Sequence, residues 1–227
     1  MKRYAIANWK SHKSAAAVTP WFADLTIPAS TESLEIVIAP PFTLLPRLLE
    51  EVTKNNLPIS LAAQDVSPYP LGAYTGEVAA QQLADLGVVY CIVGHSERRK
   101  YFHETDQDVA KKIAELLHFS ITPVLCLDEA YITSQAKMLT KEQREAVLVA
   151  YEPITAIGSG HPVSVDTVKK VVTTIHEHFP NVPVLYGGSV DAKNVSEYLL
   201  ATQGVLVGTD SLAGKDFSGI LAHCAND

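Results

Sequence analysis

Ala150-Tyr-Glu-Pro-Ile-Thr-Ala-Ile-Gly-Ser-Gly160 overlaps the end of an apolar run, residues 146–151, whose length and β-branched content predict a buried strand. Glu152 stands at the carboxyl end of that strand, and Pro153 and a glycine-bearing loop of small residues follow it. A carboxylate at the tip of a strand, followed by a loop that can close, suits proton abstraction in a water-excluded pocket. Taken alone, however, the stretch is explained more simply by a turn with a solvated glutamate.

Three other apolar runs end in the same way. Asn8-Trp-Lys10 follows residues 4–7, Val93-Gly-His-Ser-Glu-Arg-Arg99 follows residues 88–92, and Tyr186-Gly-Gly-Ser189 follows residues 182–185. Polar, glycine-rich motifs that recur just past strands are typical of a parallel barrel, whose active site lies at the carboxyl ends of its strands.

Strand-like and helical segments alternate along the whole chain. We expect strands at residues 4–8, 34–39, 59–63, 88–93, 122–126, 146–151, 182–186 and 204–207. We expect helices at residues 18–24, 44–54, 77–86, 106–119, 165–179, 193–201 and 217–223, with Thr105 and Ser164 capping two of them. The pattern predicts an α/β fold, a single (β/α)₈ barrel over residues 1–227, rather than an open sheet. A dinucleotide fold is disfavoured because no Gly-x-Gly-x-x-Gly follows the first strand.

Composition narrows the function classes. The net charge of −7 disfavours broad nucleic-acid binding, so an anionic ligand would have to be attracted locally. No apolar run reaches the roughly 18 residues of a membrane span, and the N-terminus does not resemble a signal peptide. Cys91, Cys126 and Cys224 lack zinc-site spacing, and the first two lie in apolar runs, so we expect buried thiols and a reducing cytoplasm.

The motifs, taken together, resemble the triosephosphate isomerase family. Asn8-Trp-Lys10, Ala73-Tyr-Thr-Gly-Glu77, Gly94-His-Ser-Glu-Arg-Arg99, Tyr151-Glu-Pro153 and Tyr186-Gly-Gly-Ser189 occur in the family's order and approximate spacing. The resemblance runs from residue 4 to about residue 221. It implies interconversion of dihydroxyacetone phosphate and glyceraldehyde 3-phosphate through an enediolate, in glycolysis and gluconeogenesis, without cofactor or metal.

The resemblance also assigns catalytic roles. Glu152 becomes the base, His95 the electrophile, and Lys10 the cation that offsets developing negative charge, with Glu97 as its ion-pair partner and Asn8 as a neutral amide donor. Ser96 reads as a helix start, and a helix N-terminus favours a neutral imidazole at His95. Each residue alone has a simpler explanation: a surface carboxylate, a core histidine, a solvated or imine-forming lysine, or a turn asparagine.

Phosphate binding is expected mainly from backbone N–H groups at Gly158, Ser189, Gly208 and Thr209. The sequence departs from the family at Thr155, Pro162, Thr209 and Asp210, which bear on the loop and the phosphate site. We expect the Asp210 carboxylate to turn away from the anion and cap the short helix that follows.

Two segments bear on assembly. In the family, the loop at residues 64–77 inserts into a neighbouring subunit, where Thr75 supports the partner's Asn8 and Lys10, so the resemblance implies a homodimer. Tyr69, Leu71 and Tyr74 are costly to expose together, which favours the same interpretation. Only 19 residues separate Cys126 from Ala146, so we expect a trimmed fifth helix that leaves a strip of the barrel wall exposed. A second dimer could cover this strip, so both a dimer and a tetramer are possible.

Two alternatives remain at this point. One is another phosphate-binding barrel enzyme, such as a sugar-phosphate isomerase or aldolase, which would not explain Asn8, Lys10, His95 and Glu152 together. The other is a barrel that has lost turnover and serves as a binding or scaffold protein, which the altered loops would suggest and the intact catalytic set opposes.

Overall fold

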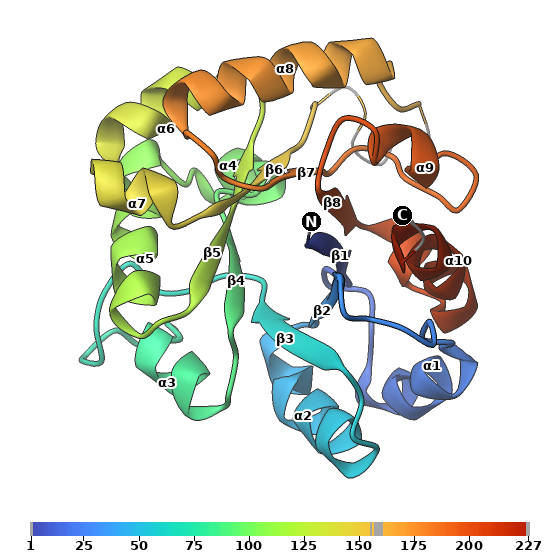
Figure 1. Ribbon diagram of the computed structural model, residues 1–227. Helices are drawn as coiled ribbons and strands as arrows, with labels where there is room; N and C mark the ends of the chain where they lie inside the picture. Colours follow the sequence, from blue (N-terminus) through green and yellow to red (C-terminus); the bar gives the residue numbers. More distant parts are fainter. Residues whose placement is uncertain (1, 155, 157–160, 226–227) are drawn as a thin grey trace.

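The predicted barrel is confirmed in the computed structural model, which describes residues 2–154, 156 and 161–225. The strands of this part of the chain close into a parallel barrel in sequence order, with β8 pairing with β1 (Figure 1). They are β1 (Arg3–Asn8), β2 (Leu34–Ala39), β3 (Ile59–Ala63), β4 (Tyr90–Val93), β5 (Thr122–Leu127), β6 (Leu148–Tyr151), β7 (Val184–Tyr186) and β8 (Gly204–Val207).

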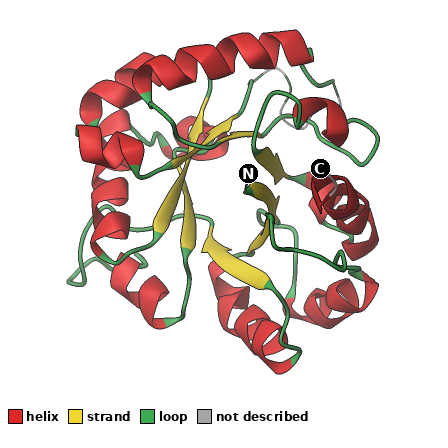
Figure 2. Cartoon of the chain, viewed as in Figure 1, coloured by secondary structure: helices red, strands yellow, loops and turns green. Residues whose placement is uncertain are grey.

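Helices surround the barrel on all sides (Figure 2). The α-helices of the described residues are α1 (Val18–Asp24), α2 (Leu45–Lys54), α3 (Ala80–Asp85), α4 (Ser96–Phe102), α5 (Asp106–His118), α6 (Ile132–Met138), α7 (Lys141–Glu145), α8 (Val165–His178), α9 (Val195–Tyr198) and α10 (Gly214–Ala225). Short 3₁₀ turns are η1 (Ala15–Ala17), η2 (Phe42–Leu44) and η3 (Thr209–Ser211). None of the described helices is both long and apolar enough to span a membrane.

The strands bury both of their faces. On β1, Ile6 belongs to the cluster inside the barrel, whereas Ala5 and Ala7 pack towards the helices, as the two-residue period of a strand requires. The inner cluster consists of Ile6, Val37, Ala39, Ala62, Ile92, Val124, Cys126, Leu148, Ala150, Leu185 and Leu206. The middle of the barrel is therefore a packed core, and the polar residues past the strands collect at one end of it.

Helix starts follow the predicted capping chemistry. Thr105 Oγ1 accepts from the backbone N–H of Asp108, while Asp108 Oδ2 accepts from the N–H of Thr105, so the predicted capping box forms. Ser164 caps α8 by accepting from the N–H of Thr167 at 3.2 Å.

Three strands, β4, β6 and β7, begin two residues later than predicted, and local chemistry accounts for β6 and β7. β6 begins two residues later than expected because Ala146 is the C-cap of α7, and β7 begins after Pro183, which has no N–H to donate.

The prediction of an exposed barrel wall near the trimmed segment is wrong. Instead of one full helix the segment folds into α6 and α7, and Ile132, Ala136 and Leu139 are buried against the core. Strand β6 is fully buried beneath them. Short helices cover the wall because a few well-placed apolar side chains suffice to shield one strand.

Candidate active site

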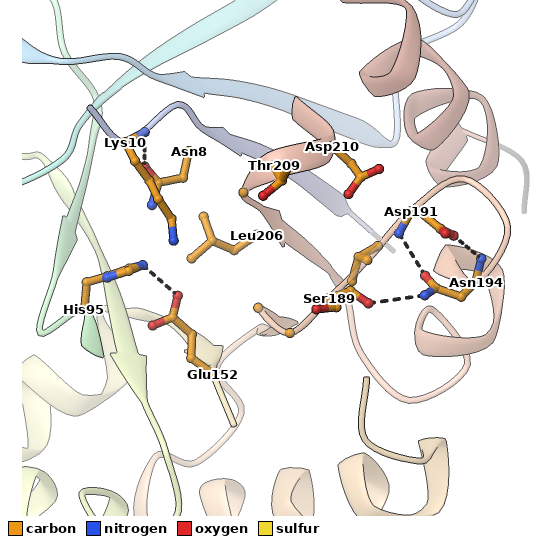
Figure 3. A pocket seen from close by; sticks show the side chains of 14 residues that line it. Asn8, Lys10, His95, Glu152, Ser189, Asp191, Asn194, Leu206, Thr209 and Asp210 are labelled. Atoms are coloured by element: carbon orange, nitrogen blue, oxygen red, sulfur yellow. Dashed lines mark hydrogen bonds and ion pairs between the residues drawn. The ribbon is translucent and has the colours of Figure 1, made fainter. Parts of the chain in front are cut away.

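A pocket of about 330 Å³ opens at the carboxyl ends of the strands. It is lined by residues that follow five strands, β1, β4, β6, β7 and β8, among them Lys10, His95, Glu152, Ser189 and Thr209 (Figure 3). The barrel therefore brings together groups that lie up to 202 positions apart in the chain, from Asn8 to Asp210, because parallel strands all present their carboxyl ends at the same rim.

Glu152 occupies the floor of one end of this pocket. Its side chain is almost fully buried, and Oε1 lies 3.2 Å from Nε2 of His95. Oε2 is buried and has no hydrogen-bond partner among the described residues. A buried carboxylate oxygen without a donor is costly, and such atoms are found where a function requires them. This oxygen is free to accept a proton from a bound molecule.

Gly187 leaves the room that Glu152 occupies. A Cβ atom at position 187 would lie 2.7 Å from Cγ of Glu152, closer than any ordinary contact. The N–H of Gly187 donates to the carbonyl of Tyr151 at 2.8 Å, which fixes this backbone beside the carboxylate. The glycine is therefore required here for close approach rather than for an unusual backbone angle.

His95 is both a pocket residue and the N-cap of α4. Its Nδ1 accepts from the backbone N–H of Glu97 at 3.2 Å, so Nδ1 carries no proton and Nε2–H points to Glu152 and the pocket. Burial lowers the pKa of His95, but the charge and contact of Glu152, with the charge of Glu97, outweigh it and raise the pKa overall. The hydrogen bond from the Glu97 N–H requires an unprotonated Nδ1, so it favours the neutral imidazole and opposes these charges.

Arg99 fixes the backbone in front of His95. Its Nε donates to the carbonyl of Gly94 at 2.9 Å, and its other nitrogens bond Asp106 at 2.7 Å and Gln135 Oε1 at 2.8 Å. Gly94 has φ +69°, a conformation that strongly favours glycine. Gln135, fully buried on α6, was not predicted to take part.

Lys10 adopts a strained backbone conformation, with φ +46°. Its N–H donates to Oδ1 of Asn8 at 3.1 Å, and its carbonyl accepts from Nε2 of Gln64 at 2.9 Å. Gln64 also donates to the carbonyl of Ala39 at 2.8 Å. Gln64 was not predicted to support Lys10, because only the folded chain brings the end of β3 near the end of β1.

The side chain of Lys10 forms the predicted ion pair. Its Nζ lies 2.7 Å from Oε1 of Glu97. Burial would raise the pKa of Glu97, but the hydrogen bond from Lys10 and the charges of His95 and Lys10 lower it overall. An ion-paired ammonium is not the neutral amine that imine formation needs, which excludes the Schiff-base interpretation of Lys10.

The other end of the pocket is built mainly of glycines and small polar residues. Gly187, Gly188 and Ser189 follow β7, and Gly208 and Thr209 follow β8. The hydroxyl of Ser189 donates to the carbonyl of Ala156 at 2.6 Å. Backbone N–H groups on glycine-rich turns are suited to binding an anion. Gly158 and Thr155 lie outside the described residues.

Comparison with known proteins identifies the family. The family model described as triosephosphate isomerase matches residues 3–224. The chain belongs to the triosephosphate isomerase family. It is 38% identical to triosephosphate isomerase of Gloeobacter violaceus, over 97% of this chain and 98% of that protein, and 37% identical to that of Xanthomonas euvesicatoria pv. vesicatoria, over 99% of each.

A solved structure agrees with the sequence relatives. The crystal structure of triosephosphate isomerase from Bartonella henselae matches with a TM-score of 0.85 at 26% identity, covering 98% of this chain and 99% of that one. The resemblance drawn from the motifs is therefore confirmed, and so is the barrel.

Within the family pattern, the structure gathers Asn8, Lys10, His95, Glu97 and Glu152 around one pocket or its wall. Thr75 lies elsewhere, on an exposed loop. No group of three or more His, Cys, Asp or Glu side chains in the described ranges could hold a metal ion.

The expectation for Asp210 is wrong. Asp210 lines the pocket, and its carboxylate bonds its own backbone N–H rather than capping α10. Asp210 is the middle residue of the 3₁₀ turn η3, which follows Gly208 directly after β8. Asp191 and Asn194, also in the lining, were not predicted.

Proposed function

We propose that Glu152, His95, Lys10 and Asn8 carry out the family's reaction, the interconversion of dihydroxyacetone phosphate and glyceraldehyde 3-phosphate. The observation that supports this most strongly is the direct contact of Glu152 Oε1 with Nε2 of His95 at 3.2 Å, while the buried Oε2 of Glu152 has no hydrogen-bond partner among the described residues. A base and an electrophile in such contact can flank a planar enediolate.

The reaction then proceeds by two proton transfers, one from the substrate to Glu152 and one back. Glu152 takes a proton from the carbon next to the substrate carbonyl, and the electron pair moves to the carbonyl oxygen, giving an enediolate. His95 stabilises this oxygen by donating a hydrogen bond from Nε2, and Lys10 and Asn8 offset its charge. Glu152 returns the proton to the neighbouring carbon, so that no cofactor or metal is consumed.

The phosphate group binds at the glycine-rich end, against the backbone N–H groups of Ser189, Gly208 and Thr209, with Gly158 as a further donor from the loop. Ser189 and Thr209 line the same pocket as Glu152 (Figure 3), so one small substrate can contact the phosphate site and the base together. Binding energy at the phosphate positions the reacting carbons at Glu152.

An assay with glyceraldehyde 3-phosphate, coupled to a dehydrogenase that reduces dihydroxyacetone phosphate, tests this function. Wild type should turn over rapidly, and the alternative barrel enzymes should not. A protein that binds phosphoglycolate but shows no turnover would establish the binding or scaffold alternative instead.

We propose further that the chain acts as a homodimer through the loop at residues 64–77. Residues 69–77 are all exposed, and the rings of Tyr69 and Tyr74 stack at 4.6 Å at its tip. Leu71 is 52% exposed. An apolar tip of this kind suits burial against another protein.

The same surface offers a matching hollow. A depression of about 390 Å³ lies beside the active site and is lined by Lys10, Glu97, Tyr101 and other residues. Tyr101, which lines it, is 63% exposed, and Phe102, the next residue along the chain, is 66% exposed. A partner loop in this hollow would bring Thr75 next to Lys10, as the family resemblance implies. The argument for a tetramer rested on an exposed barrel wall, which is covered, so we propose only the dimer.

Light scattering over a dilution series tests the dimer. Wild type should remain dimeric, whereas Thr75→Arg should dissociate and lose activity in parallel, because it forces a charge into the interface. Thr19→Arg, on exposed α1, is a matched control that should remain dimeric. A wild type that is monomeric and fully active would refute the proposal.

The cellular compartment and the domain organisation are part of the same proposal. Cys91, Cys126 and Cys224 are buried free thiols, as a reducing cytoplasm would maintain them. We assign the protein to that compartment and treat residues 1–227 as one catalytic domain that binds neither nucleic acid nor membrane.

A further inference from the structure

The turn that carries Asp210 is held rigidly at the phosphate end of the pocket. The hydroxyl of buried Ser211 donates to the carbonyl of Gly208 at 2.7 Å, and the indole N–H of Trp21 donates to the carbonyl of Ser211 at 3.0 Å. Lys13 Nζ donates to the carbonyl of Leu212, the next residue. Because the turn is braced from both sides, Asp210 stays in the pocket lining beside Thr209 (Figure 3).

Other charged groups surround this carboxylate. Asp191, from the loop after β7, and Asp216, from the first turn of α10, are the charges that act on it, and Lys10 reaches the pocket from β1 but is paired with Glu97. Lys13 is directed to a carbonyl rather than to Asp210. Burial, followed by the charges of Asp191 and Asp216, raises the pKa of Asp210.

Besides Glu152, the pocket lining contains two carboxylates, Asp191 and Asp210, and that of Asp191 already accepts hydrogen bonds. Its Oδ1 accepts from the backbone N–H of Lys193 at 2.8 Å and of Asn194 at 3.0 Å. Asn194 in turn accepts from the N–H of Asp191 and donates to the carbonyl of Ser189. Among the described residues, the Asp210 carboxylate bonds only its own backbone N–H, so it can change protonation state without breaking the local structure.

We propose that Asp210 is a specificity-determining residue that takes up a proton from solvent when a phosphate dianion binds beside it. The proton converts the carboxylate to a neutral carboxyl, whose O–H donates to a phosphate oxygen, and it returns to solvent when the ligand leaves. Without this proton, a carboxylate next to a dianion would repel it. The site therefore binds phosphate monoesters more weakly as the pH rises, beyond the effect of the ester's own ionisation. This inference rests on the proposed function.

Calorimetry of phosphoglycolate binding tests the proposal directly. Titrations at one pH in buffers of different ionisation enthalpy give the number of protons taken up. Wild type should take up more protons than Asp210→Asn, whose amide donates a hydrogen bond without titrating. Asp216→Asn, which removes a nearby charge outside the pocket lining, is the control and should still take up the proton.

Kinetics give an independent readout. The KM for glyceraldehyde 3-phosphate should be lower in Asp210→Asn than in wild type, and the ratio of the two KM values should grow by up to about tenfold per pH unit over the pH range in which wild type takes up the proton. The ester's own ionisation is the same in both proteins and cancels in the ratio. Equal proton uptake together with a KM ratio that does not change with pH would overturn the proposal. Absence of turnover in wild type would instead count against the proposed function.

Discussion

Gly187→Ala should impair catalysis by displacing Glu152. The new Cβ would lie 2.7 Å from Cγ of Glu152, and 3.4 Å from both Oε1 and the carbonyl oxygen of Tyr151. Carbon atoms in contact rest at about 3.5–4.0 Å, so the glutamate side chain must move by about 1 Å. The backbone at position 187 cannot yield instead, because its N–H is bonded to Tyr151.

A displacement of this size has a predictable cost. Misplacing a catalytic group by 1 Å lowers the rate by about 100-fold, so kcat of Gly187→Ala should fall by that factor. The coupled isomerase assay measures kcat, and chemical denaturation measures the free energy of unfolding of the same preparation.

Gly87→Ala separates this effect from a general loss of stability. Gly87 has φ +75° and lies in the turn before β4, at the opposite end of the barrel, with open space around its Cα. Its replacement should cost about 1–2 kcal/mol of unfolding free energy but leave kcat unchanged. If Gly187→Ala keeps kcat within twofold of wild type, the argument that this glycine positions Glu152 is refuted.

Three further perturbations test other parts of the site and fold. In steady-state kinetics, His95→Gln should lower kcat by less than Glu152→Gln does, because the amide of glutamine still donates a hydrogen bond. A loss in His95→Gln that equals or exceeds that of Glu152→Gln would mean that His95 has another role. Gln64→Leu leaves the carbonyl of Lys10 without its hydrogen-bond donor. It should lower kcat about tenfold and the free energy of unfolding by about 1–3 kcal/mol. If neither value changes, Gln64 does not support the site. Burial raises the pKa of the Cys224 thiol from 9.0 to about 12, so the unfolded chain alone loses this proton above pH 9. The free energy of unfolding should therefore fall with rising pH between those values, by about 1.4 kcal/mol per pH unit, and Cys224→Ala, followed by denaturation at several pH values, should lack this component.

Much of the architecture could be predicted because polar, glycine-rich motifs directly follow the apolar runs that form the strands. The runs that end at Asn8, Gly94 and Glu152 were identifiable from apolar content, and parallel pairing alone brings their tips together. The capping of α5 by Thr105 and of α8 by Ser164 is equally local, since the partner lies three residues away.

The supporting groups could not be predicted because they act across the fold. Gln64 reaches Lys10 over 54 positions, and Gln135 reaches Arg99 over 36, so no local pattern marks either one. Both are ordinary glutamines in sequence. The position of Asp210 was mispredicted for a similar reason: its direction depends on the tight turn η3, which is braced by Trp21 from another part of the chain.

The central claim is that Glu152 moves a proton between adjacent carbons of a triose phosphate. Incubation of dihydroxyacetone phosphate with the protein in D₂O, followed by NMR, measures deuterium entering the carbon next to the carbonyl. Wild type should exchange this hydrogen and form glyceraldehyde 3-phosphate, whereas Glu152→Gln should fold, bind phosphoglycolate and exchange about 10³-fold more slowly or less, since an amide cannot accept the proton. Exchange by Glu152→Gln within about tenfold of the wild-type rate, less than removal of a general base costs, would contradict the account.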